Sequence, residues 1–175
     1  MKNKNRIYSA LEVARHIINY ANSNDQLLSN LKLQKLLYFV QAEFLTSQGR
    51  TCFTDDIEVW NFGPVVPAVF REFKIFGSFH IPPVKHYYVE DESQPFNFRR
   101  VVFYDIEITD EDKTVIDEVV DYFADCSSVE LTDLTQKQLP WQNAYIKHLK
   151  IVISPQSIKE YFTKKRTIKV QKVIK

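Results

Sequence analysis

Apolar residues recur at helical spacing through residues 31–48, and this is the strongest hydrophobic pattern in the chain. They lie at Leu33, Leu36, Leu37, Val40 and Phe44. The spacing is typical of one face of an α-helix. A second apolar stripe, made by Leu31, Tyr38 and Leu45, runs along another face. A helix that is apolar on more than one side packs against neighbours on each, so this helix is expected to lie at the centre of the fold.

Capping signals predict where the helices begin and end. Ser9 and Glu12 have the spacing of a capping box, which predicts a helix from there to about Asn22. Ser29 or Asn30 is placed to cap the central helix, and Gly49 is placed to end it in a left-handed conformation. Further helices are predicted to begin at Pro67, Thr109, Ser127 and Ser154.

Strand signals are weaker and fall into two regions. Weak alternation at 55–62 predicts a short strand, which runs into a rigid turn at 63–67. Residues 82–90 and 99–108 have strand composition and are expected to form a ribbon. A two-stranded ribbon is marginal by itself, so it is predicted to lie on the helices. The predicted fold class is mainly α, a compact helical domain with a small two-stranded β ribbon, at the margin of α+β.

The composition is that of one globular domain. The 175 residues are 45% apolar and 26% charged. We expect a single domain at 1–163 and a basic tail at 164–175. Residues 105–133 contain eleven acids and one lysine, whereas 159–175 contain seven bases and one glutamate. Such blocks are usually solvated, but the acidic one would suit a basic partner. The tail leaves open a nucleic-acid-binding regulator as the alternative function.

Motifs for catalysis, metals and cofactors are absent from the sequence. The three glycines form no phosphate-binding loop, and the two cysteines and four histidines have no zinc spacing. Asp55 and Asp56 are better explained by a turn than by a metal site. We therefore expect no enzyme, no cofactor and no metal, although a small enzyme with unrecognised residues stays an alternative. No apolar run is long enough for a signal peptide or a membrane span, which predicts a soluble cytoplasmic protein.

The first two predicted helices and their short polar connection leave a DNA-binding helix-turn-helix open. The second helix carries only Lys32 and Lys35 as basic residues and is otherwise mostly apolar. A helix that reads DNA needs a polar, basic face for base edges and phosphates. DNA recognition by this pair is therefore disfavoured.

Two motifs in fixed order resemble the SocA-like antitoxin family, also called the Panacea domain, which includes GepA-like phage-associated proteins. They are the helix LKLQKLLYF at 31–39 and the turn EVWNFGPVVP at 58–67. The segment ALEVARHII at 10–18 is similar to the family's first helix, and LTDLT at 131–135 with PW at 140–141 is similar to its late segment. Gln136 stands where the family often has histidine, which argues against chemistry at that position.

The resemblance implies a mainly helical protein that neutralises a cognate protein toxin, encoded by a neighbouring gene, through direct contact. It also implies that some members deliver the toxin to a cellular protease as adaptors. Candidate partner-binding residues come from the two motifs: Lys32, Gln34, Lys35, Tyr38, Trp60, Phe62, Gly63, Pro64 and Val65. Lys32, Gln34 and Lys35 are expected at an exposed edge of the helix, with a merely solvated face as the alternative. For Trp60 the alternative is packing on the central helix. The oligomeric state stays open.

Overall fold

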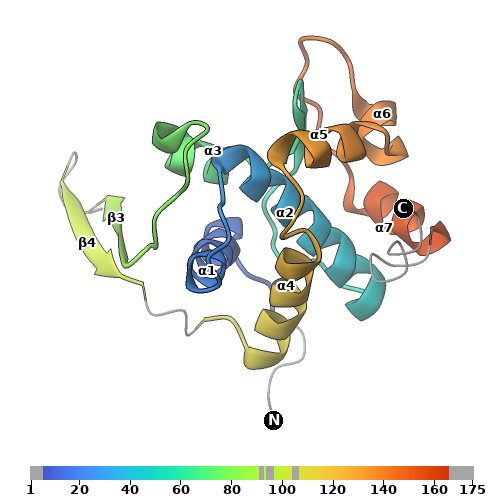
Figure 1. Cartoon of the computed structure of the whole chain (residues 1–175). Helices are drawn as coiled ribbons and strands as arrows, with labels where there is room; N and C mark the ends of the chain where they lie inside the picture. Colours follow the sequence, from blue (N-terminus) through green and yellow to red (C-terminus); the bar gives the residue numbers. More distant parts are fainter. Residues whose placement is uncertain (1–5, 91–92, 94–96, 104–106, 166–175) are drawn as a thin grey trace.

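The computed structural model describes residues 6–90, 93, 97–103 and 107–165 (Figure 1). Over these residues the chain forms seven α-helices and two two-stranded antiparallel sheets. The α-helices are α1 (Ala10–Ser23), α2 (Asn30–Glu43), α3 (Pro67–Phe73), α4 (Asp110–Tyr122), α5 (Ser128–Gln136), α6 (Leu139–Ala144) and α7 (Pro155–Lys164). A π-helical turn, η1 (Phe44–Gln48), continues α2, and a 3-10 turn, η2 (Lys74–Phe76), continues α3. The predicted mainly α class with a small β ribbon is confirmed.

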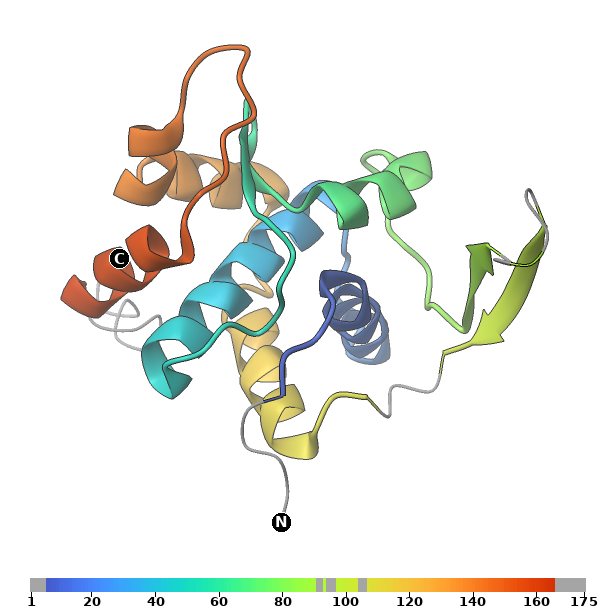
Figure 2. The same ribbon diagram turned by 180° about the vertical axis from the view of Figure 1, so that it is seen from behind.

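Helix α2 is the centre of the fold, as its two apolar stripes predict. It contacts α1, α3, α4, α5 and α7, which surround it in both views (Figures 1 and 2). From Lys32 to Glu43 every residue of α2 is buried. Fully burying a Leu, Phe or Val side chain stabilises by roughly 1.5–3 kcal/mol. This one helix therefore supplies a large part of the core.

The helices begin at the predicted capping residues. Ser9 and Glu12 form a capping box on α1, Ser127 and Glu130 form another on α5, and the Ser29 hydroxyl accepts a hydrogen bond from the Lys32 amide. The central helix ends at Gly49, whose φ of 71° is left-handed. Pro140 and Trp141 lie inside a separate short helix, α6, that the capping signals did not predict.

The ribbon of β3 (His86–Glu90) and β4 (Phe98–Val102) departs from the expectation in position and length. It projects away from the helices in both views, rather than lying on them (Figures 1 and 2). The Tyr87 ring packs on the Arg15 guanidinium of α1, with 3.7 Å from the Arg15 Cζ to the ring centroid. Pairing runs from His86 opposite Val102 to Glu90 opposite Phe98. The second strand therefore ends before Ile108, which is buried beside α4.

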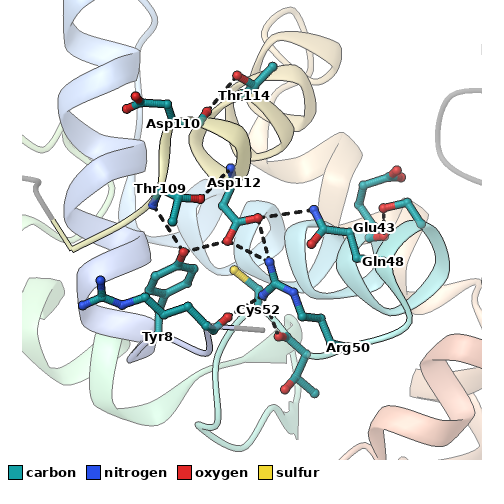
Figure 3. Close-up of polar contacts among 12 residues, drawn as sticks. Tyr8, Glu43, Gln48, Arg50, Cys52, Thr109, Asp110, Asp112 and Thr114 are labelled. Atoms are coloured by element: carbon teal, nitrogen blue, oxygen red, sulfur yellow. Dashed lines mark hydrogen bonds and ion pairs between the residues drawn. The ribbon is translucent and has the colours of Figure 1, made fainter. Parts of the chain in front are cut away.

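A buried carboxylate ties α4 to the N-terminal segment and to the chain that follows η1 (Figure 3). Both oxygens of Asp112 lie 2.7 Å from Nη2 of Arg50. The Tyr8 hydroxyl donates to Asp112 at 2.6 Å, and burial together with this bond raises the pKa of Tyr8. Three segments far apart in sequence are thus joined at one carboxylate.

Replacing Asp112 with Asn should lower the free energy of unfolding by about 2 kcal/mol. Removing one member of a buried ion pair leaves the other charge without compensation, which costs roughly 3–5 kcal/mol when burial is complete. The Arg50 side chain keeps 12% of its surface exposed, so solvent reduces the loss. Urea unfolding measures the effect, and Asp110→Asn in the same helical turn is the control because that side chain is exposed. Equal losses in the two variants would contradict the role of Asp112.

The basic tail falls mostly outside this description. Helix α7 runs to Lys164, and residues 166–175 are not among the described residues. The domain boundary at residue 163 therefore stays a prediction. None of the helices in the described ranges combines the length and apolar character needed to cross a bilayer.

Candidate partner-binding site

The two sequence motifs meet in the structure, because polar side chains of α2 hold the hairpin of β1 (Glu58–Trp60) and β2 (Gly63–Val65). Gln34 accepts a hydrogen bond from the Val66 amide at 2.9 Å, and the Lys35 amine donates to the Pro64 carbonyl at 3.1 Å. Each bond satisfies a backbone group that burial would otherwise leave unpaired. The helix motif therefore fixes the position of the turn motif.

The expectation that Lys32, Gln34 and Lys35 lie on an exposed edge is wrong. Their exposed fractions are 7%, 1% and 0%. A long polar side chain can lie along apolar surface and bring its polar end to a distant acceptor, which helical periodicity does not reveal. Lys32 reaches past the core in this way and donates to the Ala124 carbonyl at 2.7 Å. Tyr38, also fully buried, donates to Gln138 at 2.9 Å.

These positions also argue against DNA reading by α1 and α2. The two basic side chains of α2 are directed into the protein, where each is bonded to a backbone carbonyl. A recognition helix has to present such groups to base edges and phosphates. Of the four α2 candidates, Gln34 and Lys35 hold the hairpin, whereas Lys32 and Tyr38 bond to Ala124 and Gln138.

Lys35 is a buried amine at the base of the hairpin. Burial lowers its pKa to about 7. The backbone of Gly63 approaches it so closely that a Cβ at this glycine would lie 2.8 Å from Lys35 Cε and 2.8 Å from Thr135 Oγ1. Gly63 also has a φ of 96°, which side-chain-bearing residues rarely adopt. This glycine is therefore required both by space and by conformation.

The late motif packs on the same hairpin. The Trp141 indole donates to the Trp60 carbonyl at 3.3 Å, and the Gln136 amide donates to the Asn61 carbonyl at 2.6 Å. Gln136 therefore helps to hold the turn of the hairpin in place. The outer edge of β1 is covered as well, since the Val59 amide donates to the Ile151 carbonyl at 2.8 Å. The helix motif and the late motif therefore both hold the hairpin formed by the turn motif.

Beside the hairpin lies an open apolar groove with a volume of about 380 Å³. Its apolar lining is formed by Leu31, Val59, Trp60, Phe62, Val65, Phe70 and Leu149, and its polar lining by Gln34, Asn61, His148 and Lys150. The groove brings together Trp60, Phe62, Val65 and Gln34 from the candidate list. Gly63 and Pro64 are buried behind it.

Aromatic side chains dominate the exposed part of the groove. Phe62 at the hairpin tip is 67% exposed and Leu149 on the opposite loop is 54% exposed. Trp60 is half-buried and packs on Phe70 of α3, with the ring centroids 4.9 Å apart. Solvent-facing aromatic and aliphatic groups around a concave apolar surface are typical of sites that bind another protein or a small apolar ligand.

The acidic block at 105–133 is partly engaged within the protein. Asp117 lies 2.8 Å from Nε2 of His16, and Asp121 accepts a hydrogen bond from the Tyr20 hydroxyl at 2.7 Å. Glu130 also takes part in the capping box of α5, and Asp110, Glu111 and Asp112 lie in the first turn of α4. Attraction of a basic partner by this block stays a prediction.

Features that would support an enzyme are weak in the described part of the chain. No group of three or more His, Cys, Asp or Glu side chains there could hold a metal ion. Cys52 is fully buried, and this burial raises the pKa of its thiol. A thiol that stays protonated is a poor nucleophile. Asp55 accepts a hydrogen bond from the Ala10 amide at 2.8 Å, which gives this acid a structural role.

Sequence reasoning missed seven of the residues that line the groove: Leu31, Val59, Asn61, Phe70, His148, Leu149 and Lys150. Leu31 belongs to an apolar stripe that was interpreted as core, and Val59 and Asn61 lie within the turn motif. The loop at 148–150 carries no motif, and it reaches the groove only because the following residues pair with β1. No local signal in the sequence could have identified it.

The comparisons with known proteins agree with the motifs. The family model described as antitoxin SocA-like, Panacea domain, matches residues 33–142. A curated relative, antitoxin SocA of Caulobacter vibrioides (strain NA1000 / CB15N), is 43% identical over 72 residues. This alignment covers 41% of the chain and 38% of the relative, so the chain spans well under two thirds of that protein. No solved structure matches the chain significantly. Because the family model covers more than half of its residues, the chain belongs to the antitoxin SocA-like, Panacea domain family.

Proposed function

We propose that the protein is a non-enzymatic antitoxin, which neutralises a cognate protein toxin by direct contact at the groove beside the β1–β2 hairpin. The observation that carries this proposal is that residues of the helix and turn motifs line one exposed apolar groove, beside a hairpin that the late motif also contacts. Family membership supports an antitoxin role in general, and the relative's name refers to that relative alone. The toxin is expected to be the product of a neighbouring gene.

The hairpin is suited to binding because it is held rigidly before a partner arrives. Bonds from Gln34, Lys35 and Gln136 fix its backbone. An ordered site loses less conformational entropy on binding, so more of the contact energy appears as affinity. Phe62 and Trp60 present large aromatic surfaces, and aromatic side chains are favoured at the centres of protein interfaces.

Co-expression with the product of the adjacent gene tests the proposal. We expect the adjacent product alone to arrest growth, and co-expression to restore growth and yield a stable complex on purification. A harmless neighbour that does not co-purify would contradict the proposal. If the two proteins bound each other while growth stayed arrested, the protein would contact the toxin without neutralising it.

Delivery to a protease is a finer version of the same function. An adaptor shortens the lifetime of its bound toxin in cells, whereas simple occlusion leaves that lifetime unchanged or longer. The toxin's half-life after translation is stopped, measured with and without the antitoxin, distinguishes the two.

The alternative function, nucleic-acid binding by the basic tail, depends mainly on residues 166–175, outside the described part. It would require RNA or DNA affinity that falls log-linearly with salt and vanishes when residues 164–175 are removed.

A further inference from the structure

We propose that the groove selects a partner segment in which a bulky apolar side chain is followed within a few residues by a carboxylate, and that Lys150 and His148 bind this carboxylate. The inference rests on the proposed function, because it names the chemistry of the segment that a toxin would insert. It also makes a claim about the groove that can be tested without a toxin.

The first argument is the distribution of charge around the groove. Its lining contains two basic side chains, His148 and Lys150, and no acidic one. Both are exposed and lie two positions apart on one loop, while the Glu58 carboxylate beside the groove accepts a hydrogen bond from the Trp60 indole at 2.8 Å. An apolar cavity with charge of one sign at one end favours a ligand with the opposite charge at that end.

The second argument is the position of the Lys150 ammonium. It lies 4.1 Å from the centroid of the Trp60 ring. The ring face attracts the cation without accepting a conventional hydrogen bond, so the N–H donors of the ammonium can still bind an acceptor. The ammonium is thereby held over the groove wall, at a site where a carboxylate from a partner can bind it.

The third argument is that the loop carrying both bases is ordered. Its first residue, Tyr145, stacks on Trp141 with ring centroids 4.4 Å apart, and its hydroxyl donates to Asn61 at 3.4 Å. Its far end is paired with β1 through Ile151. His148 has a φ of 69°, so the loop turns sharply between these two anchors. Because the loop is fixed, the distance between the apolar lining of the groove and the positive charge is constant, so it can select the spacing of the two groups in a ligand.

The fourth argument concerns how a segment can enter. Addition of a partner strand to the hairpin is blocked, because β1 has neighbours on both edges. On the side of β2, Lys35 is bonded to the Pro64 carbonyl and Gln34 to the Val66 amide that follows the strand. Recognition therefore has to come from side chains inserted into the groove rather than from backbone pairing. When side chains are recognised, one apolar group and one charged group of the partner segment are enough to determine which segments bind.

Selection of a phage-displayed library of random dodecapeptides on the purified full-length protein tests the inference. We expect enriched peptides to share a bulky apolar residue with Asp or Glu one to three positions later. Selection on Lys150→Glu should shift the charged position to Lys or Arg. Lys147→Glu is the matched control, because Lys147 is an exposed base of the same loop that does not line the groove, and it should enrich the wild-type motif.

Synthetic peptides then give the magnitude. Replacing the acidic residue of the best peptide with Lys should weaken binding to the wild type on the order of tenfold, and this loss should be reversed on Lys150→Glu. No enriched motif, a motif without acidic residues, or the same acidic motif on Lys150→Glu would overturn the inference. If the enriched peptides carried the acidic motif but the product of the neighbouring gene proved harmless, only the proposed function would be contradicted. If a toxin bound the protein but the enriched peptides shared a motif without charged residues, only this inference would be contradicted.

Discussion

Replacing Gly63 with Ala is expected to lower the free energy of unfolding by about 3–5 kcal/mol, which is more than the loss expected for Gly49→Ala. Two costs add at this position. A left-handed backbone disfavours a side chain by roughly 1–3 kcal/mol, and forcing atoms into filled space costs roughly 1–3 kcal/mol more. The new Cβ would meet Lys35 and Thr135 at 2.8 Å, and both neighbours are fully buried. Urea unfolding of the purified variant measures the loss.

Gly49→Ala is the control that separates the two costs. Gly49 also has a positive φ, 71°, but nothing lies within 4 Å of the position its Cβ would take. Only the conformational cost applies there, so its loss should be about 1–2 kcal/mol. If both variants lost the same stability, close approach to Lys35 would not be the reason for a glycine at position 63.

The pH dependence of stability should reveal the buried amine of Lys35. Its pKa is about 7 in the folded protein because of burial, against 10.5 for an ordinary lysine. Between these two values the unfolded chain holds a proton that the folded chain has lost, so raising the pH favours folding. The contribution should rise by about 1.4 kcal/mol per pH unit above pH 7, reaching roughly 3 kcal/mol at pH 9.

The measurement is the difference in unfolding free energy between the wild type and Lys35→Met at pH 6, 7, 8 and 9. Subtracting the variant removes the titration of all other groups. The difference should be flat below pH 7 and then shift in favour of the wild type. Lys137→Met, which removes an exposed lysine, should give a flat difference throughout. A flat difference for Lys35→Met as well would mean that its amine keeps an ordinary pKa.

The helical framework could be predicted because its signals are local. Capping by Ser9, Ser29 and Ser127 depends on residues three positions apart, and the apolar stripes of α2 repeat every turn. These patterns determine where helices begin and which faces are buried. They do not determine where polar side chains on a buried helix end, which is why Gln34 and Lys35 were expected at an exposed edge.

The groove could be predicted only in part, because its walls come from distant segments. Trp60 and Phe62 lie within a motif and were candidates, whereas Lys150 is brought there by pairing between β1 and residues 151–153. Such pairing depends on the whole fold. The length and direction of the β3–β4 ribbon were missed for a similar reason, since alternation predicts strands but not what they pack against.

The affinity of the purified cognate toxin for Phe62→Glu and for Ile75→Glu tests most directly whether the groove is the binding site. Phe62 is 67% exposed at the groove, and Ile75 is 84% exposed on η2 outside it, so neither change should unfold the protein. We predict that Phe62→Glu weakens binding by about thirtyfold or more, the effect of losing an interface hot spot, and that Ile75→Glu changes it by less than about twofold. Unchanged affinity in Phe62→Glu, or a larger loss in Ile75→Glu, would contradict the groove as the site of toxin contact.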